Sequence, residues 1–319
     1  MIYVYYIMGL ILLANWCTAS IGDKSMIYMV CLQQCERNIC HVETLEQTTF
    51  YEKFLGWNCF EECKYSCMWQ TVERYKATGR PVPQFYGKWP FLRLFGLQEP
   101  ASVLFSIFNG VSSIFGFIKY SRRVPSNAPM HIILSVQIIL TINAWLWSTV
   151  FHGHDFPWTE KLDYFSATSI VIFSIYVFIH RVTIGISSLY RVVLRSCFGM
   201  TLIIFYVTHI YYLSSIKFDY GYNMIVNIMF GLLGSVAWLC YCFLVWKRQP
   251  YVFKMIACIL LTNVFLCLEV FDFPPLFWIL DAHSIWHLLT IPLPLLYYSF
   301  FTDDSFFVYS RSEVKNKLQ

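Results

Sequence analysis

Two histidines, His283 and His287, lie four residues apart in the stretch Asp281–His287, at the start of the last apolar segment. Residues at i and i+4 share one face of a helix, so both imidazoles can reach the same metal ion. Ionisable side chains at the edge of a bilayer are costly unless they serve a function. The alternative is two polar residues at a water interface, each with its own hydrogen bond.

A second set of polar residues favours the metal site. Ser148 and His152 are again four residues apart at the end of an apolar segment, and Asp163 opens the next one. Together with His283 and His287, His152 completes three imidazoles, which with one water form the usual open zinc site of a hydrolase. Zinc would lower the pKa of that water toward about 7 and polarise a carbonyl. Asp163 could then accept a proton, and Ser148 could hydrogen-bond to the water or the oxyanion.

Two points of this interpretation stay open. Asp281 or a backbone carbonyl could orient one of the imidazoles. A Ser-His-Asp triad with Ser148 as the nucleophile is the competing mechanism, although it leaves two histidines without a role.

The other histidines carry weaker signals. His154 points away from His152 if the helix continues, although Gly153 is able to end it. We expect His180 to be solvated and His209 to make a hydrogen bond between helices.

The composition predicts helices that cross a membrane. Of the 319 residues, 57% are hydrophobic and only 13% are charged, whereas a soluble domain carries about a quarter charged residues. Seven segments are long enough, or nearly so, to span a bilayer: about 101–118, 130–151, 164–180, 196–213, 222–246, 255–273 and 282–301. The expected fold is an all-α membrane protein, a bundle of seven transmembrane helices. Pro292 and Pro294 predict a kink in the seventh.

Six of the twelve cysteines gather in the polar region before the first span: Cys31, Cys35, Cys40, Cys59, Cys63 and Cys67. An even, dense set after an apolar leader indicates three disulfides in an oxidising compartment, and six cysteines allow 15 pairings. A zinc module is the alternative, but the spacing lacks paired C-x2-C knuckles. We expect a signal peptide at 1–20, a disulfide-rich lumenal domain at 21–100, the transmembrane domain at 101–301 and a cytosolic tail at 302–319.

Charged loops set the orientation. The first, third and fifth connections and the tail carry twelve lysines and arginines, against Lys161 and Lys217 in the other three connections. The positive-inside rule places the richer set in the cytosol and the N-terminal region and candidate site in the lumen. The tail lysines, Lys315 and Lys317, resemble a dilysine signal that coat proteins read between the Golgi and the endoplasmic reticulum. A solvated basic tail is the alternative.

The pattern of site residues resembles a known superfamily. Its spacing is similar to that of the seven-span hydrolases that include alkaline ceramidases and progestin/adiponectin receptors: Ser148-x3-His152-x10-Asp163, then His283-x3-His287. The six-cysteine region resembles one branch in particular, the Per-like family of post-GPI-attachment-to-proteins factors. Further matching stretches are Cys59–Trp69, Gln84–Phe91 and Asn143–His152.

The resemblance implies remodelling of glycosylphosphatidylinositol (GPI) anchors. Members of that family remove the sn-2 acyl chain from the phosphatidylinositol part of GPI-anchored proteins, as a GPI-specific phospholipase A2 of the Golgi or early secretory membranes. The resemblance assigns His152, His283 and His287 as zinc ligands, with Ser148 and Asp163 as catalytic groups. GPI-anchored proteins and membrane lipid are the expected partners, and no nucleotide loop or nucleic-acid motif is evident.

Three other functions remain as alternatives: a ceramidase-like amidase, a seven-span receptor, and a non-catalytic folding or cargo factor. The ceramidase branch lacks the six-cysteine region, and a retrieval-like tail disfavours a cell-surface receptor. A folding factor predicts that His287→Ala leaves function intact, whereas hydrolysis predicts its loss.

Overall fold

The structure is a computed structural model that describes residues 21–40, 55–270 and 272–317. The predicted signal peptide at 1–20 lies outside the described residues. Regular structure in the described part is helical, apart from three isolated β-bridges. The chain divides into two units. The first comprises Met1–Val103, His152–His154 and Cys267–Ile285, and the second Leu104–Phe151, Asp155–Leu266 and Trp286–Gln319.

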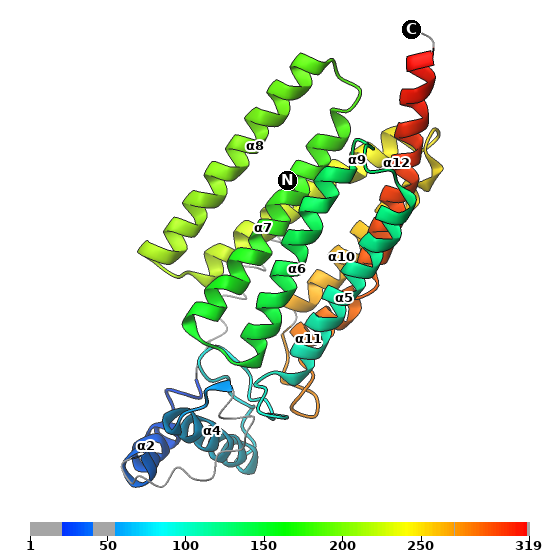
Figure 1. Cartoon of the computed structure of the whole chain (residues 1–319). Helices are drawn as coiled ribbons and strands as arrows, with labels where there is room; N and C mark the ends of the chain where they lie inside the picture. The colour runs from blue at the N-terminus through cyan, green and yellow to red at the C-terminus, as the bar shows by residue number, and fades with distance from the viewer. Residues whose placement is uncertain (1–20, 41–54, 271, 318–319) are drawn as a thin grey trace, which may run out of the picture. The chain divides into compact units, whose positions relative to one another are not determined.

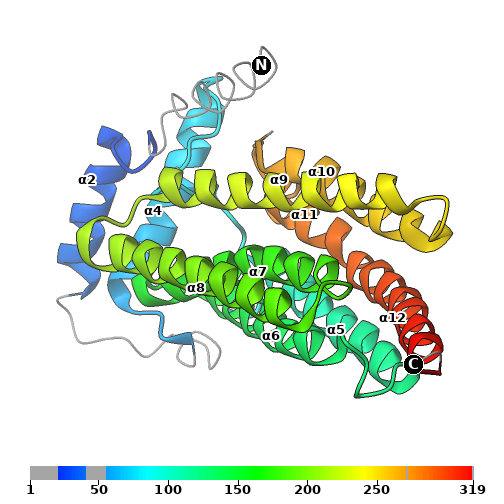
Figure 2. The same ribbon diagram turned by 90° about the horizontal axis from the view of Figure 1, so that it is seen from above.

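Six helices are long and apolar enough to cross a membrane, in agreement with the predicted all-α membrane fold. Those of the second unit run side by side, with α7 packed against α8 and α9 (Figures 1 and 2). Their bounds are α5 Pro100–Arg123, α6 His131–Gly153, α7 Pro157–Val182, α8 Ser188–Tyr211, α9 Tyr220–Val245 and α10 Phe253–Val270. A π-helical turn, Tyr212–Ile216, extends α8, and a 3-10 turn, Pro250–Val252, precedes α10.

Helices α5, α7 and α8 extend well beyond the apolar segments that predict them. The third predicted segment is 164–180, but α7 already begins at Pro157. A proline suits that position because its missing N–H would have no partner there. The fourth helix begins at Ser188 rather than near 196 and so includes Arg191 and Arg195. Both arginines donate to carbonyls at or just beyond the end of α7, those of Ile184 and His180.

The seventh predicted segment is broken at the prolines, which confirms the expected kink. Helix α11 spans Ala282–Thr290 and α12 spans Leu293–Lys317. A break in a helix leaves carbonyls without their usual partners, and in lipid these need donors from neighbouring helices. Asn109 of α5 donates to the carbonyl of His287 at 2.7 Å, and Ser112 donates to that of Ile291.

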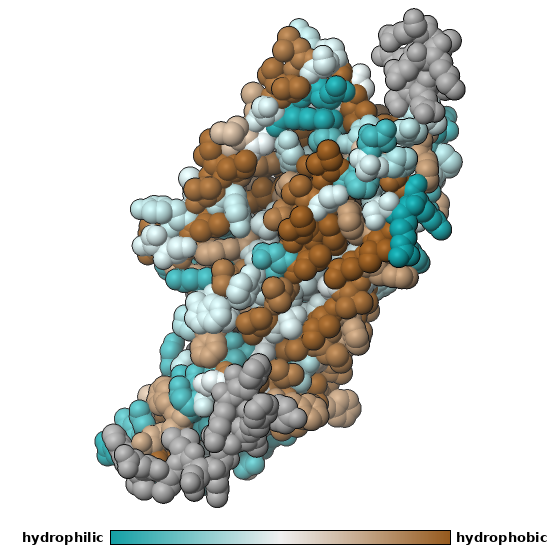
Figure 3. Space-filling view, in the orientation of Figure 1, coloured by the Kyte–Doolittle hydropathy of each residue, from teal (hydrophilic) through white to brown (hydrophobic). Residues whose placement is uncertain are grey.

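The core of the second unit is aromatic. Trp238 of α9 meets Phe300 and Phe301 of α12 edge to face, and both phenylalanines are fully buried. In contrast, many leucine, isoleucine and valine side chains on the outer helix faces are exposed. Figure 3 shows such hydrophobic side chains gathered over the helices of this unit. An apolar core with an apolar exterior is what a bundle surrounded by lipid requires.

The second unit contains a buried ion pair. Arg181 of α7 contacts both carboxylate oxygens of Asp304 on α12, and the Tyr251 hydroxyl donates to the same carboxylate at 2.9 Å. Asp304 has no exposed surface. The neighbouring residue, Asp303, pairs with Lys254 at 2.6 Å, but these two side chains are 40% and 23% exposed. The two pairs therefore differ chiefly in burial.

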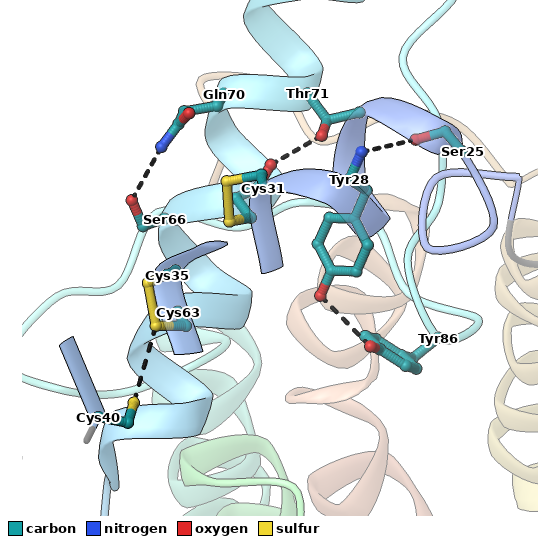
Figure 4. The surroundings of a disulfide bond; sticks show 11 residues. Ser25, Tyr28, Cys31, Cys35, Cys40, Cys63, Ser66, Gln70, Thr71 and Tyr86 are labelled. Atoms are coloured by element: carbon teal, nitrogen blue, oxygen red, sulfur yellow. Dashed lines mark hydrogen bonds between the residues drawn. A yellow bond between two sulfur atoms is a disulfide. The ribbon is translucent and has the colours of Figure 1, made fainter. Parts of the chain in front are cut away.

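In the first unit, two helices carry the six cysteines. Helix α2, Met26–Cys35, continues into a π-helical turn, Glu36–Cys40, and both pack against α4, Cys59–Ala77. The three predicted disulfides are confirmed, with the pairing Cys31–Cys67, Cys35–Cys63 and Cys40–Cys59. Figure 4 shows the Cys35–Cys63 bond between the helices. The first of the six cysteines thus pairs with the last, as antiparallel helices require.

Helical geometry explains why one cysteine spacing differs from the others. Successive cysteines on α4 are four residues apart, which keeps them on one face. On the segment that packs against α4, Cys35 and Cys40 are five residues apart, and the chain between them forms the π-helical turn. A π-helix takes i→i+5 hydrogen bonds, so the wider spacing still returns Cys40 to the face of Cys35. All three pairs have Cα atoms 5.7 Å apart.

The disulfides also decide against a zinc module in this region. Sulfur atoms of Cys40, Cys59 and Cys63 lie close enough together to hold a metal ion. Each of them, however, belongs to a disulfide, and the metal ligand is the thiolate. Their proximity reflects two disulfides stacked one helical turn apart.

Candidate metal centre

Three histidines converge on one point. His152 is the last residue but one of α6, while His283 and His287 lie in the first two turns of α11. One ring nitrogen from each lies within 4.8 Å of the others. The Nε2 atoms of His152 and His283 are 3.3 Å apart. His152 and His287 are buried, and His283 is half-buried.

This geometry fits a tetrahedral zinc ion. With Zn–N bonds of about 2.0–2.1 Å, two ligand nitrogens on a tetrahedron are separated by about 3.3–3.4 Å. The separation of the His152 and His283 Nε2 atoms has that value. Three imidazoles also leave a fourth coordination position, as in catalytic zinc sites. The residues that the sequence predicted as ligands are therefore the residues that the structure brings together.

Asp281 caps the N-terminus of helix α11. The Asp281 carboxylate accepts a hydrogen bond from the Ser284 N–H at 2.8 Å, and the Ser284 hydroxyl accepts one from the Asp281 N–H at 2.9 Å. This reciprocal cap satisfies N–H groups that have no partner within the helix. The sequence suggests Asp281, or a backbone carbonyl, as the group that could orient an imidazole. The structure instead uses Asp281 to fix the beginning of the helix that carries His283 and His287.

The carboxylate that contacts an imidazole is that of Glu99, a residue the sequence reasoning missed. Its Oε2 lies 2.7 Å from Nδ1 of His152, and its Oε1 accepts a hydrogen bond from Lys88 at 2.7 Å. Burial would raise the pKa of Glu99, but the positive charge of Lys88 and the contact with His152 outweigh burial and hold it well below its usual range. An ionised Glu99 accepts a hydrogen bond from the Nδ1–H of His152, which leaves Nε2 of His152 as the ligand atom.

A sequence signal for Glu99 did exist. It immediately precedes Pro100, the first residue of α5, so it is an ionisable group at the very edge of an apolar helix. Ionisable groups at that position are costly without a function, as at the histidines of α11, so the position of Glu99 itself indicates a role.

Ser148 lies one turn before His152 on α6 and is buried. Its hydroxyl is 3.0 Å from that of Ser106 on α5. Asn109, one turn further along α5, holds the carbonyl of His287. Helix α5 thus contacts both α6 and α11 through polar side chains, Ser106 and Asn109. No motif in the sequence predicted a role for these two residues.

Asp163 lies in the second turn of α7 and is half-buried. Among the described residues, the histidine cluster that could hold a metal ion does not include Asp163. Its catalytic role stays a prediction.

Two of the remaining histidines contact structural partners. Helix α6 ends at Gly153, and the His154 ring stacks on Trp57 with ring centres 3.6 Å apart. His209 of α8 lies 3.1 Å from the Asn223 oxygen of α9, which confirms the expected hydrogen bond between helices. His180 is half-buried rather than solvated.

Comparison with known proteins gives one consistent answer. Residues 49–305 match the Per1-like family. The chain is 43% identical over 306 residues to the Bos taurus protein named GPI-specific phospholipase A2-like PGAP3, covering 94% of each chain. It is 42% identical over 305 residues to the Homo sapiens protein of the same name, again covering 94% of each. The Drosophila melanogaster protein named post-GPI attachment to proteins factor 3 is 40% identical over 295 residues, which cover 90% of this chain and 89% of that protein.

No solved structure matches the chain significantly. The family match covers most of the chain, and the relatives match it over about nine tenths of their length. The Per1-like match also agrees with the family that the cysteine region and the spacing of the site residues resemble. The chain belongs to the Per1-like family.

Proposed function

We propose that this protein remodels GPI anchors by hydrolysing the sn-2 acyl ester of their phosphatidylinositol, as a zinc-dependent phospholipase A2. The observation that carries this proposal is the three-histidine cluster of His152, His283 and His287. It occurs in a chain whose relatives are named GPI-specific phospholipase A2-like. The spacing of the cluster suits zinc, and an ester is a substrate that zinc hydrolases cleave.

Each residue of the site has a role in this proposal. Zinc held by the three histidines would supply an activated water and a Lewis acid for the ester carbonyl. Ser148 would donate a hydrogen bond to the attacking water or to the developing oxyanion. Asp163 would accept a proton as the general base and return it to the leaving alcohol of the lipid.

The contacts of His152 argue against the serine triad. In a triad, the base accepts a proton from the serine through one ring nitrogen and is oriented through the other. Nδ1 of His152 is directed at Glu99 and Nε2 at His283, while the Ser148 hydroxyl contacts Ser106. These contacts favour His152 as a ligand over His152 as the base of Ser148.

The cellular setting is part of the same proposal. The protein is a multi-pass membrane protein, and the loop charges favour a lumenal N-terminus and a cytosolic C-terminus. We place it in the Golgi membrane, with cycling through the endoplasmic reticulum by way of Lys315 and Lys317. The proposed domains are a signal peptide at 1–20, a lumenal cysteine domain at 21–100, the hydrolase domain at 101–301 and the tail at 302–319.

Lipid mass spectrometry of GPI anchors tests the proposal directly. Cells that lack the protein should keep the original sn-2 chain, and the wild-type protein should restore the remodelled chain. His283→Ala should fail to do so, although it reaches the same membrane in the same amount. His131→Gln is the matched control, because His131 lies at the opposite end of the helix that carries His152. Unaltered sn-2 chains in cells without the protein would refute the assignment.

Two further measurements separate the alternatives. A folding or cargo factor predicts that His287→Ala rescues GPI-anchor remodelling as well as the wild type does. A ceramidase-like amidase predicts release of sphingosine from ceramide by the purified protein. The proposed phospholipase should release fatty acid from a GPI lipid and none from ceramide.

A further inference from the structure

Glu99 has more contacts with His152 than an incidental ion pair would have. Its carboxylate reaches the His152 ring, while its own N–H donates to the His152 carbonyl at 3.0 Å. The preceding N–H, of Gln98, donates to the Gly153 carbonyl at 2.9 Å. The last carbonyls of a helix have no partner within it, so this segment closes the end of α6. Glu99 is therefore fixed through its backbone to the same residue whose ring it contacts.

The next residue adds a further constraint. Pro100 is the first residue of α5, and a residue that precedes proline is driven to an extended conformation. The backbone of Glu99 is thus restricted from both sides. Few rotamers then remain that carry its carboxylate to the His152 ring.

Lys88 completes the arrangement. The two oxygens of Glu99 are divided, with Oε1 on Lys88 and Oε2 on His152. Lys88 belongs to a tight turn in which Phe85 and Lys88 exchange backbone hydrogen bonds, with Gly87 at a φ of +81°. An anion buried as deeply as Glu99 requires a charged or hydrogen-bonded partner. Without Lys88, the carboxylate would lose the donor that holds Oε1 in place.

We propose that Glu99 is the positioning residue of the metal centre, which fixes the ring and tautomer of His152 and is itself held by Lys88. This inference rests on the proposed function only in that the three histidines hold zinc. Carboxylates that hydrogen-bond to a ligand histidine set its orientation and raise its basicity, and their loss typically weakens metal binding about 10- to 100-fold. Glu99 does not touch the substrate in this proposal. It acts through His152.

The Lys88–Glu99 contact links the cysteine-rich region to the metal centre. Lys88 and Glu99 both fall within residues 21–100, the proposed lumenal domain. A deletion of that whole region would remove the positioning carboxylate together with the disulfides. Such a deletion should therefore weaken zinc binding, whereas a deletion that spares the segment from Phe85 onward, with its Phe85–Lys88 turn, should keep the metal.

Zinc affinity of the purified full-length protein is the test. The protein in lipid nanodiscs is titrated with zinc against a chromogenic chelator, and bound metal is counted by elemental analysis. Glu99→Ala should weaken zinc binding about 10- to 100-fold. Glu99→Gln and Lys88→Met should weaken it by a smaller factor, because the ring keeps part of its support. Glu73→Gln, which alters an exposed carboxylate of α4, should bind zinc as the wild type does.

A cobalt-loaded sample provides a readout that a purely structural role would not change. The visible absorption of bound cobalt reports the ligand geometry, and it should change in Glu99→Ala while the three disulfides stay intact on non-reducing mass analysis. If Glu99→Ala does not fold, Glu99→Gln and Lys88→Met decide the matter. Wild-type zinc affinity and cobalt spectra in these variants would overturn the inference.

Failure of the inference and failure of the zinc site give different results. If His152→Ala loses zinc while the Glu99 variants keep it, only the positioning role is wrong. If His152→Ala, His283→Ala and His287→Ala all bind zinc normally, the proposed metal centre itself is wrong.

Discussion

Replacement of Arg181 by methionine should destabilise the protein far more than replacement of Lys254 by methionine. Asp304 is fully buried, and its carboxylate is held by two guanidinium hydrogen bonds and by Tyr251. Arg181→Met leaves a buried carboxylate with one neutral donor. Removal of one partner from a buried ion pair costs about 3–5 kcal/mol. Lys254→Met breaks the partly exposed pair with Asp303, which should cost about 0–1 kcal/mol.

Unfolding by sodium dodecyl sulfate in mixed micelles measures these differences as free energies. The double variant Arg181→Met/Asp304→Asn should recover most of the loss, because the uncompensated charge is gone and the amide oxygen that replaces the carboxylate can still accept from Tyr251. Zinc content should stay unchanged, because neither Arg181 nor Asp304 belongs to the histidine cluster. Equal destabilisation by Arg181→Met and Lys254→Met would refute the reasoning, as would a double variant no more stable than Arg181→Met.

Three further predictions concern the metal, the disulfides and the polar face of α5. Removal of zinc by a chelator should lower the midpoint temperature of unfolding. Zinc at about 100 times its dissociation constant should raise the free energy of unfolding by about 2.7 kcal/mol. His287→Ala should abolish this response, and an unfolding midpoint of the wild type that does not change with zinc would contradict the site. The double variant Cys40→Ala/Cys59→Ala should cost the cysteine-rich unit about 2–5 kcal/mol, seen as faster proteolysis there at unchanged stability of the spans; equal proteolysis would count against it. Asn109→Ala should cost about 0.6–1.7 kcal/mol in micelle unfolding by removing the donor to the His287 carbonyl, and no loss would mean that Thr290 alone satisfies that carbonyl.

Hydropathy predicted the helical spans but not their ends. An apolar segment measures how much of a helix contacts lipid or core, whereas a helix ends where its hydrogen bonds and caps end. Helix α7 therefore extends back to Pro157 through a polar first turn, and α8 begins at Ser188 with two arginines that reach the end of α7. The break at Pro292 was predictable because proline acts locally, through its ring and missing N–H.

In the candidate site, too, local patterns were predictable from the sequence and contacts between distant residues were not. The pairs Ser148/His152 and His283/His287 follow from helical periodicity, which is visible in the sequence. The contact between Glu99 and His152 joins residues 53 positions apart, and no local pattern reports it. The pairing of the cysteines was also hidden, since six cysteines allow 15 arrangements and only the packing of α2 against α4 selects one.

The nested disulfides impose an order in which they are best formed during synthesis. The innermost pair, Cys40–Cys59, closes a separation of 19 residues, whereas the outermost, Cys31–Cys67, spans 36. Once the innermost bond exists, the next pair must close only roughly nine residues of free chain, because the crosslink short-circuits the loop between them. Each disulfide thus lowers the entropic cost of forming the next, so the three can form in order from Cys40–Cys59 outward to Cys31–Cys67. Cys31, the first of the six to be synthesised, waits longest for its partner, so an oxidase that joined neighbours as they appeared would have to be corrected by an isomerase.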